Sequence, residues 1–300
     1  MGLGLEGEIT DEKESAGAWD LTFRAQGQPF TVSKQAASTG EVEHAVRHSK
    51  GDFIACGASG IVERLPSGDV IKSPWPGLPA VDNRRDLITE NRIYKRLGNH
   101  DRLVKVIAWD PEECALTMEY MPNGCLKDYL RAHNHSISVA QRFRWAQEAA
   151  MGLQLLHSVN VVHCDVEPRN FLLDADLALK IADFSGSSLE GSPASACPGT
   201  RFLPPDFDWS SEPTAQDDLF GLGSTIYTIM TGRYPFQNLG SDKVQKLYMA
   251  RKFPDVREIP CAEIIQRCWR SEFSSAQDVY NCIPTMEVSR FLIITRQKLD

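Results

Sequence analysis

The run DLFGLGSTIYTIM, from Asp218 to Met230, is the feature that most restricts how this chain can fold. A helix formed there would be apolar nearly all round, so it has to be surrounded by other protein. The segment from Val139 to His157 repeats apolar residues at helical spacing, which predicts an amphipathic helix of about five turns. A buried helix with a long amphipathic neighbour predicts that this half of the chain is a helical lobe.

The earlier part of the chain is rich in strand patterns instead. Between Asp52 and Ser73, the runs FIACGASGIVERL and DVIKS flank the turn tripeptide Pro66-Ser67-Gly68, which predicts a glycine-interrupted hairpin. A helix is expected from about Asn83 to Leu97, where a glycine follows, with Leu87, Tyr94 and Leu97 on one apolar face. Later, FLLDADLALKIADF predicts two short strands across an Asp-Ala-Asp turn. Strands first, helices second, and a break near Pro122-Asn123-Gly124 predict an α+β protein with a small β-rich lobe and a larger helical one.

The start of the chain carries a weaker signal. Residues 1 to about 18 are rich in Gly and Glu with little to bury, which predicts disorder. From Trp19 to Val32, apolar and polar residues alternate around a Gly-Gln turn, which indicates a short hairpin or an added edge strand. We therefore expect a partly disordered extension over residues 1–49 and a main domain over residues 50–300, with lobes at 50–121 and 122–300.

Composition excludes several kinds of partner. The 32 basic and 40 acidic residues give a net charge of −8 without a long Lys/Arg cluster, which argues against nucleic acid or an anionic membrane. No apolar run reaches the ~18 residues of a membrane helix, and the acidic start lacks the order of a signal peptide. The 8 cysteines are scattered without a C-x-x-C pair, as expected of reduced thiols used in packing. We expect an intracellular protein, cytoplasmic or nuclear; its oligomeric state cannot be read from the sequence.

The stretch HCDVEPRNFLL, from His163 to Leu173, carries the clearest functional signal, together with Asp-Phe-Ser at 183–185. It resembles the catalytic loop of eukaryotic-type protein kinases, which is His-Arg-Asp, four residues and then Asn. The resemblance implies that Asp165 orients the acceptor hydroxyl and takes its proton. It also implies that Asn170 and Asp183 hold Mg²⁺ against the ATP phosphates, since hard cations choose oxygen ligands. A lone Asp or Asn near a turn is ordinary turn chemistry, so the inference depends on their ordered combination.

The glycine hairpin is similar to the phosphate-binding loop of the same family. Gly57 and Gly60 match family glycines, Val62 follows them, and Ala55 replaces the first glycine. A partial loop of this kind is by itself more often a plain β-turn.

Lys72 and Glu90 strengthen that resemblance. Glu90 lies on the apolar face of its predicted helix, and an unpaired buried carboxylate is costly, so it needs a partner. The family's lysine–glutamate ion pair would supply one, with Lys72 contacting the α- and β-phosphates of ATP. The alternative is that Glu90 lies at a solvated margin of the helix.

The resemblance extends over about residues 50–300. LTMEYMPNG is similar to the hinge that binds adenine through backbone groups, and the adenine-site residues that it implies are Val70, Met118, Glu119, Met121 and Leu172. GTRFLPPD at 199–206, the helix opened by Asp218, and RCWRSEF at 267–273 also match family motifs in their order.

Several positions depart from the family pattern. Cys164 replaces an Arg that pairs with a phosphorylated activation loop in many kinases, so activation without loop phosphorylation is expected. Ser185 replaces the glycine after Asp-Phe, and Asp206 replaces a glutamate whose partner is then uncertain. Glu167 replaces the Lys of serine/threonine kinases, while Arg169 stands where tyrosine kinases carry an Arg. Either Arg169 is the relocated cation at the transferred phosphate, or it faces solvent or pairs with Glu167.

The sequence thus predicts a protein kinase that uses ATP and Mg²⁺ and acts on protein hydroxyl groups, with serine and threonine favoured over tyrosine. One alternative is a pseudokinase that serves as a nucleotide-binding or scaffolding module, which the departures favour. A second is a small-molecule phosphotransferase of the aminoglycoside-kinase type, which shares the His-x-Asp-x-x-x-x-Asn pattern but not the later motifs. The physiological substrate and regulator are not readable.

Overall fold

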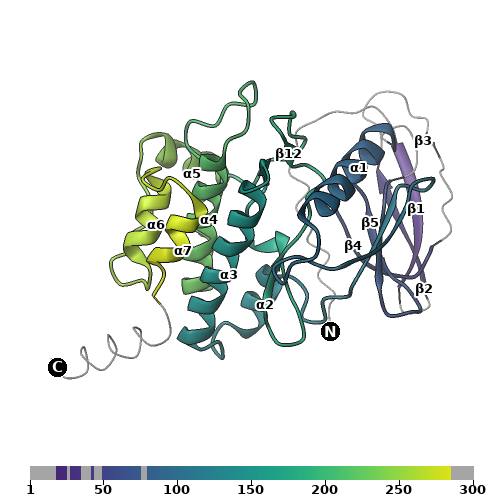
Figure 1. Cartoon of the computed structure of the whole chain (residues 1–300), viewed down its shortest axis with the longest axis horizontal. Helices are drawn as coiled ribbons and strands as arrows, with labels where there is room; N and C mark the ends of the chain where they lie inside the picture. Colours follow the sequence, from purple (N-terminus) through teal and green to yellow (C-terminus); the bar gives the residue numbers. More distant parts are fainter. Residues whose placement is uncertain (1–17, 26–27, 35–41, 44–48, 76–79, 285–300) are drawn as a thin grey trace.

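A computed structural model of the chain describes residues 18–25, 28–34, 42–43, 49–75 and 80–284, with backbone alone for 18–25, 28–34, 42–43 and 80–81. These residues form two lobes: a β-rich lobe carrying helix α1 and a lobe built almost entirely of helices (Figure 1). The expected α+β architecture, with a smaller β-rich lobe ahead of a larger helical one, is confirmed.

The β-rich lobe is built on a five-stranded antiparallel sheet with the order β4-β5-β6-β8-β7. The strands are β4 (Asp52–Cys56), β5 (Ile61–Arg64), β6 (Val70–Ser73), β7 (Val106–Asp110) and β8 (Ala115–Met118). The predicted hairpin over 52–73 therefore forms as three strands, because the glycine-containing segment is itself a turn. At the second turn, Gly68 has a φ of +96°, which a residue with a side chain adopts only under strain.

Helix α1 (Ala80–Leu97) packs on this sheet and begins a few residues before the predicted start. It ends at Gly98, whose φ of +68° is the left-handed conformation typical of a helix C-terminus. The predicted apolar face is turned inward, since Leu87, Tyr94 and Glu90 are all buried.

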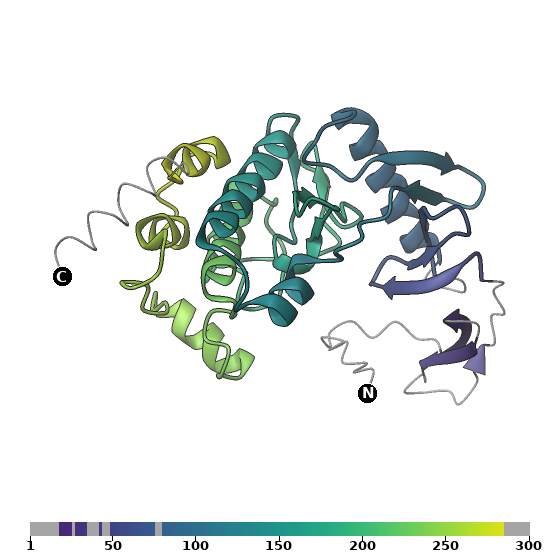
Figure 2. The ribbon, with the colours of Figure 1, turned by 90° about the horizontal axis from the view of Figure 1, so that it is seen from below.

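A small sheet precedes the five-stranded one. Strands β1 (Ala18–Ala25) and β2 (Gln28–Lys34) form an antiparallel hairpin, and β3 (Val42–Glu43) pairs with β1 in parallel. This confirms the hairpin expected over 19–32. Figure 2 shows this sheet at the outer end of the β-rich lobe, where β1 lies beside β4. The disorder predicted for residues 1 to about 18 falls outside the described residues, apart from Ala18 in β1.

In the part of the chain that the structure describes, six helices and two short strand pairs make up most of the second lobe. The helices are α2 (Leu126–His133), α3 (Val139–His157), α4 (Ala215–Thr231), α5 (Ser241–Met249), α6 (Ala262–Trp269) and α7 (Ala276–Cys282). The strand pairs are β9 (Val161–Val162) with β12 (Ser188–Leu189), and β10 (Phe171–Leu173) with β11 (Leu179–Ile181). The predicted bounds of α3 and the strand–turn–strand unit at 171–181 are confirmed.

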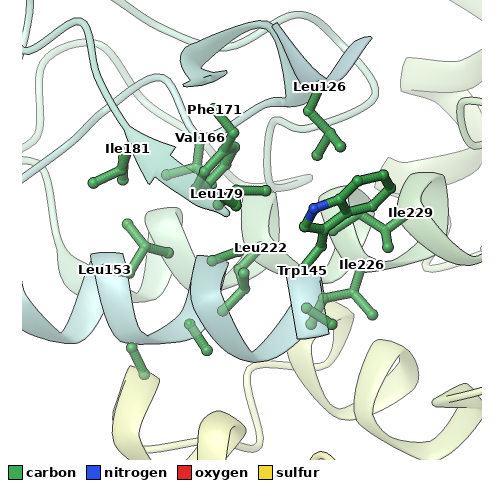
Figure 3. Close-up of a cluster of buried hydrophobic side chains, with 14 of the residues drawn as sticks. Leu126, Trp145, Leu153, Val166, Phe171, Leu179, Ile181, Leu222, Ile226 and Ile229 are labelled. Atoms are coloured by element: carbon green, nitrogen blue, oxygen red, sulfur yellow. The ribbon is translucent and has the colours of Figure 1, made fainter. Parts of the chain in front are cut away.

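Helix α4 is the centre of this lobe, as its apolar sequence predicts. Nearly every residue from Asp218 to Met230 is buried, and Thr214 and Asp217 form a capping box at the N-terminus of the helix. Figure 3 shows Trp145 and Leu153 of α3 among side chains from α4, β10 and β11, including Leu222 and Phe171. Because a cluster of this size removes much apolar surface from water, it holds α3 and α4 against strands β10 and β11.

Two expectations need correction. Val139, predicted on the buried stripe of α3, is 45% exposed because it is the first residue of the helix and projects beyond the core. The cysteines do not all serve packing: Cys114, Cys164 and Cys268 are buried, but Cys56 and Cys282 are exposed. In the described part of the chain, no helix has the length and apolarity needed to cross a membrane.

Candidate active site

The sheet residues expected around the nucleotide share one face of the five-stranded sheet. Val62 lies opposite both Ala55 and Lys72 in the strand register, and Val70 lies opposite Met118. Side chains directly opposite each other in an antiparallel pair point to the same face, and so do residues two apart along a strand. Ala55, Val62, Val70, Lys72 and Met118 are therefore brought together on one side of the sheet.

The two loop glycines have different structural requirements. A Cβ built at Gly60 would lie 2.2 Å from the Ser73 carbonyl oxygen, so the strand pairing itself requires glycine there. At Gly57 the same atom would meet nothing within 4 Å, which leaves that position open to a ligand. The turn is closed by a hydrogen bond from the Gly57 N–H to the Gly60 carbonyl at 2.9 Å. The Trp75 indole N–H also donates to the Gly57 carbonyl at 2.7 Å.

Lys72 bonds to two carboxylates at once. Its Nζ lies 2.7 Å from Glu90 Oε2 and 2.6 Å from Asp183 Oδ1. Glu90 is only 1% exposed, so it does not lie at a solvated margin of α1. Burial opposes the charge on Lys72, but the Asp183 and Glu90 carboxylates hold the pKa of Lys72 above its ordinary value. Lys72 is therefore a fixed cation that joins the sheet, α1 and the segment after β11.

Asp183 is held in the left-handed conformation, with a φ of +66°. Burial favours its neutral form, but the Lys72 ammonium and hydrogen bonds from Lys72 and Ser185 hold the pKa of Asp183 well below its usual range. The next side chain, Phe184, is fully buried between the rings of Tyr94 and His163, at centroid distances of 4.9 and 5.7 Å. Phe184 also donates its backbone N–H to Glu90 at 3.3 Å. Asp183 is thus an ionised carboxylate whose side chain is 43% exposed.

Residues of the expected catalytic loop surround the Asp165 carboxylate. Asn170 Nδ2 donates both to the Asp165 carbonyl and to its Oδ2, each at 2.7 Å. Arg169 Nη2 contacts the two carboxylate oxygens of Asp165 at 3.1 and 3.0 Å. The same guanidinium lies 2.8 Å from Glu167 Oε1, so Arg169 pairs with both acids although its side chain is 49% exposed. The pairing with Glu167 that the sequence left as an alternative is therefore present.

Glu167 is the buried acid of this group. Burial and the negative charge of Asp165 raise the pKa of Glu167 to about 7, although Arg169 opposes the shift. Its Oε1 also accepts a long hydrogen bond of 3.4 Å from the Gly199 N–H. Glu167 thus ties the catalytic loop to the segment that follows β12.

Asp218, which is buried near the start of α4, holds the backbone at His163 and Cys164 in place. It accepts the backbone N–H groups of His163 and Cys164 at 2.7 and 2.9 Å, and its Oδ2 lies 2.9 Å from His157 Nε2. Cys164 has a φ of +65° and directs its Sγ to the Val162 carbonyl at 3.3 Å. The backbone geometry of the loop is therefore set by α4, independently of which side chain stands at Cys164.

The segment after Asp183 is anchored on α1 and on itself. Arg96 of α1 lies 2.6 Å from Glu190, and the Ser195 and Ala196 N–H groups donate to the Gly186 carbonyl at 3.2 and 3.4 Å. Asp206, the other family departure, pairs with Arg251 at 3.2 Å. Both of those side chains are more than half exposed, so this pair contributes little to stability.

The hinge residues are only partly available to a nucleotide. The Glu119 N–H donates to the Lys105 carbonyl at 2.9 Å, and its carboxylate accepts from Lys180 Nζ at 2.8 Å. Of the hydrogen-bonding groups expected at Glu119, its carbonyl is therefore the one left for adenine. Met121 is buried beside this segment, and Leu172 forms an isolated bridge with Cys125 just after it.

Two oxygens are left in positions suited to a magnesium ion. The Asn170 amide nitrogen is used twice on Asp165, so Oδ1 is its remaining polar atom. Among the described residues, the hydrogen bonds from Lys72 and Ser185 to Asp183 both end on Oδ1, which leaves Oδ2. Among the described residues there is no group of three or more His, Cys, Asp or Glu side chains suited to a metal. Mg²⁺ usually takes one or two carboxylates and completes its shell with phosphate oxygens and water, so these residues fit it.

Comparison with known proteins agrees with this geometry. The sequence model of the family described as protein tyrosine and serine/threonine kinase matches residues 77–285. A probable leucine-rich repeat receptor-like protein kinase of Arabidopsis thaliana is 28% identical over 276 residues, which cover 86% of this chain and 29% of the relative. The serine/threonine/tyrosine-protein kinase HT1 of Arabidopsis thaliana is 30% identical over 201 residues, 63% of this chain and 51% of the relative. The probable serine/threonine-protein kinase PBL28 of the same plant is 29% identical over 273 residues, 78% of this chain and 72% of the relative.

Proposed function

Because this chain belongs to the protein tyrosine and serine/threonine kinase family, we propose that it is an ATP-dependent protein kinase. It would transfer the γ-phosphate of ATP to hydroxyl groups of protein substrates. The single observation that carries the proposal is the position of Lys72, bonded to Glu90 at 2.7 Å and to Asp183 at 2.6 Å. This arrangement places a buried cation beside an ionised, half-exposed carboxylate on the cleft side of the sheet.

Each expected residue has a role in this proposal. Lys72, positioned by Glu90, contacts the α- and β-phosphates, while the sheet face with Ala55, Val62 and Val70 and the turn at Gly57 and Gly60 cover the nucleotide. The adenine lies against Met118, Glu119, Met121 and Leu172. Asn170 and Asp183 would hold Mg²⁺, which neutralises phosphate charge when it is bound.

Asp165 is the proposed catalytic base. Its carboxylate is oriented by Asn170 and Arg169, so an acceptor hydroxyl would meet an oxygen whose direction is already set. Arg169 is the cation nearest to that carboxylate, and we assign it to the charge that develops on the transferred phosphate.

The acceptor, the location and the partners of the proposed kinase have separate support. Serine and threonine are the proposed acceptors because PBL28 is named a serine/threonine-protein kinase and the name of HT1 includes serine and threonine beside tyrosine. An intracellular location is proposed because the 8 cysteines are free thiols, which suits a reducing compartment. ATP and a protein substrate are the proposed partners.

Two assays test the proposal. Mg-ATP should raise the melting temperature of the purified chain, because a ligand that binds only the folded state stabilises it by mass action. Labelled ATP should then transfer phosphate to a generic protein substrate and not to a panel of small-molecule alcohols and aminoglycosides. Phosphoamino-acid analysis of the product would identify the acceptor. No shift at millimolar Mg-ATP would contradict the proposal.

A second function is favoured by one observation. Arg169 is the cation that the sequence offers in place of the missing Lys of the catalytic loop. Its pairing with Glu167 at 2.8 Å partly neutralises that charge. A pseudokinase that binds nucleotide and acts as a scaffold would tolerate this arrangement. A shift with Mg-ATP and no phosphate transfer, with any contaminating kinase removed, would favour this second function.

A further inference from the structure

Two serines that the family pattern does not use are joined to the metal-binding carboxylate. Ser59, in the turn between β4 and β5, donates from its Oγ to Ser185 Oγ at 2.8 Å. Ser185 donates in turn to Asp183 Oδ1 at 2.8 Å. Both serines are buried, each 7% exposed, although they lie 126 positions apart in the chain.

The direction of this hydrogen-bond chain is fixed by its acidic end. An ionised carboxylate can only accept hydrogen bonds, and Lys72 keeps Asp183 ionised. Ser185 therefore has to donate its single hydroxyl proton to Asp183. Since that proton is used, the bond between the two serines requires Ser59 to be the donor.

The chain restrains the carboxylate in one orientation. Asp183 Oδ1 receives Lys72 Nζ at 2.6 Å and Ser185 Oγ at 2.8 Å. With two donors on Oδ1, rotation of the carboxylate would break both bonds, so Oδ2 remains the oxygen that is free to bind a metal. A glycine after Phe184 offers no side-chain donor, so this restraint is specific to the Ser185 found here. Ser185 also has no left-handed backbone angle, so the substitution introduces no strain of that kind.

We propose that Ser185 is a positioning residue for the metal-binding oxygen of Asp183, and that Ser59 acts through it to link the phosphate loop to metal binding. The inference rests on the proposed function, because it concerns Mg²⁺ held with ATP. Its consequence is that the loop at Ser59 and the affinity for Mg²⁺ are not independent: displacement of the loop removes the donor that orders Ser185.

The test measures magnesium binding without turnover. Wild type, Ser185→Ala, Ser59→Ala and the double variant are saturated with a non-hydrolysable ATP analogue, and Mg²⁺ is titrated while the melting temperature is followed. Ser188→Ala is the matched control, because the Ser188 hydroxyl is also buried but has no hydrogen-bond partner among the described residues.

Ser185→Ala should raise the Mg²⁺ concentration at half-maximal shift by about tenfold, as expected for loss of one hydrogen bond to a charged group. The affinity for the analogue in EDTA should change by less than about twofold, because the metal is then absent. Ser59→Ala should raise the Mg²⁺ midpoint by about two- to threefold, and the double variant should match Ser185→Ala, because Ser59 acts through Ser185.

Several results would overturn the inference. Equal Mg²⁺ midpoints for Ser185→Ala and Ser188→Ala would show that the hydroxyl does not position the carboxylate. Equal losses with and without Mg²⁺ would show a general packing role instead. If Ser185→Ala does not fold, the Ser59→Ala midpoint decides, and a wild-type value refutes the link. A wild type that binds no Mg²⁺ with the analogue would refute the proposed function as well, whereas the other results leave it standing.

Discussion

Replacing Glu167 with glutamine should change how the stability of this protein depends on pH. Glu167 is 4% exposed, and burial together with the charge of Asp165 raises its pKa from 4.5 to about 7. Between these values the folded chain keeps a proton on Glu167 that the unfolded chain has released. The folded state then binds more protons, so the free energy of unfolding falls as the pH rises through this window.

The size of the effect follows from the pKa. Each pKa unit corresponds to about 1.4 kcal/mol, so the rise from 4.5 to about 7 lowers the stability by about 3 kcal/mol at pH 8. Of this decrease in the free energy of unfolding, about 2 kcal/mol occurs between pH 5.5 and pH 8. Glu167→Gln has no proton to lose, so its stability relative to wild type should increase by that amount over this interval.

Urea unfolding at pH 5.5 and pH 8 measures the difference. Trp145 and Trp269 are fully buried and report unfolding by their fluorescence. Subtracting wild type from the variant removes the groups that titrate independently of Glu167, and Glu258→Gln, at an exposed glutamate, is the control. A stability difference between Glu167→Gln and wild type that is the same at both pH values would refute the argument, since Glu167 would then ionise as it does in the unfolded chain.

Three further changes address the proposed chemistry and the segment after Asp183. Lys72→Met should abolish phosphate transfer and weaken ATP binding, whereas Asp165→Asn should abolish transfer but keep Mg-ATP binding in a thermal-shift assay; wild-type turnover in Asp165→Asn would contradict the catalytic assignment. Arg169→Ala should lower kcat by about 10²-fold with a smaller change in the Kd for ATP, because its contact matters most in the transition state, and an unchanged kcat would return Arg169 to a purely structural role. Gly186→Ala would place a Cβ 2.2 Å from the Ala196 Cβ. It should destabilise the fold by about 1–3 kcal/mol and expose residues 187–197 to proteolysis, and wild-type proteolysis of this segment would refute the close packing.

Much of the framework was predictable from local sequence. The periodic apolar residues between Val139 and His157 defined α3 to its ends, and the Asp-Ala-Asp turn located the strands β10 and β11. Such elements depend on residues a few positions apart, which share a helix face or a turn. The order of Asp165, Asn170 and Asp183 likewise indicated the site before any contact was known. Tyr94 was expected on a buried face, but its ring contact with Phe184 had no sequence signal.

The sequence by itself determined the residue types of the site: an ordered set of acids, an amide and a lysine, with Glu90 on an apolar helix face where Lys72 was its expected partner. Only the tertiary structure decided which of these groups bond to one another. Lys72 reaches Asp183 across 111 positions, and Ser59 reaches Ser185 across 126. Whether Arg169 pairs with Glu167, which the sequence left open, was decided by the fold of residues 165–169, where the guanidinium contacts both Glu167 and Asp165. A hydrogen bond weakens steeply when its length changes by a few tenths of an ångström. The lengths of the bonds between residues far apart in the chain depend on how the two lobes pack together, which no local sequence pattern encodes.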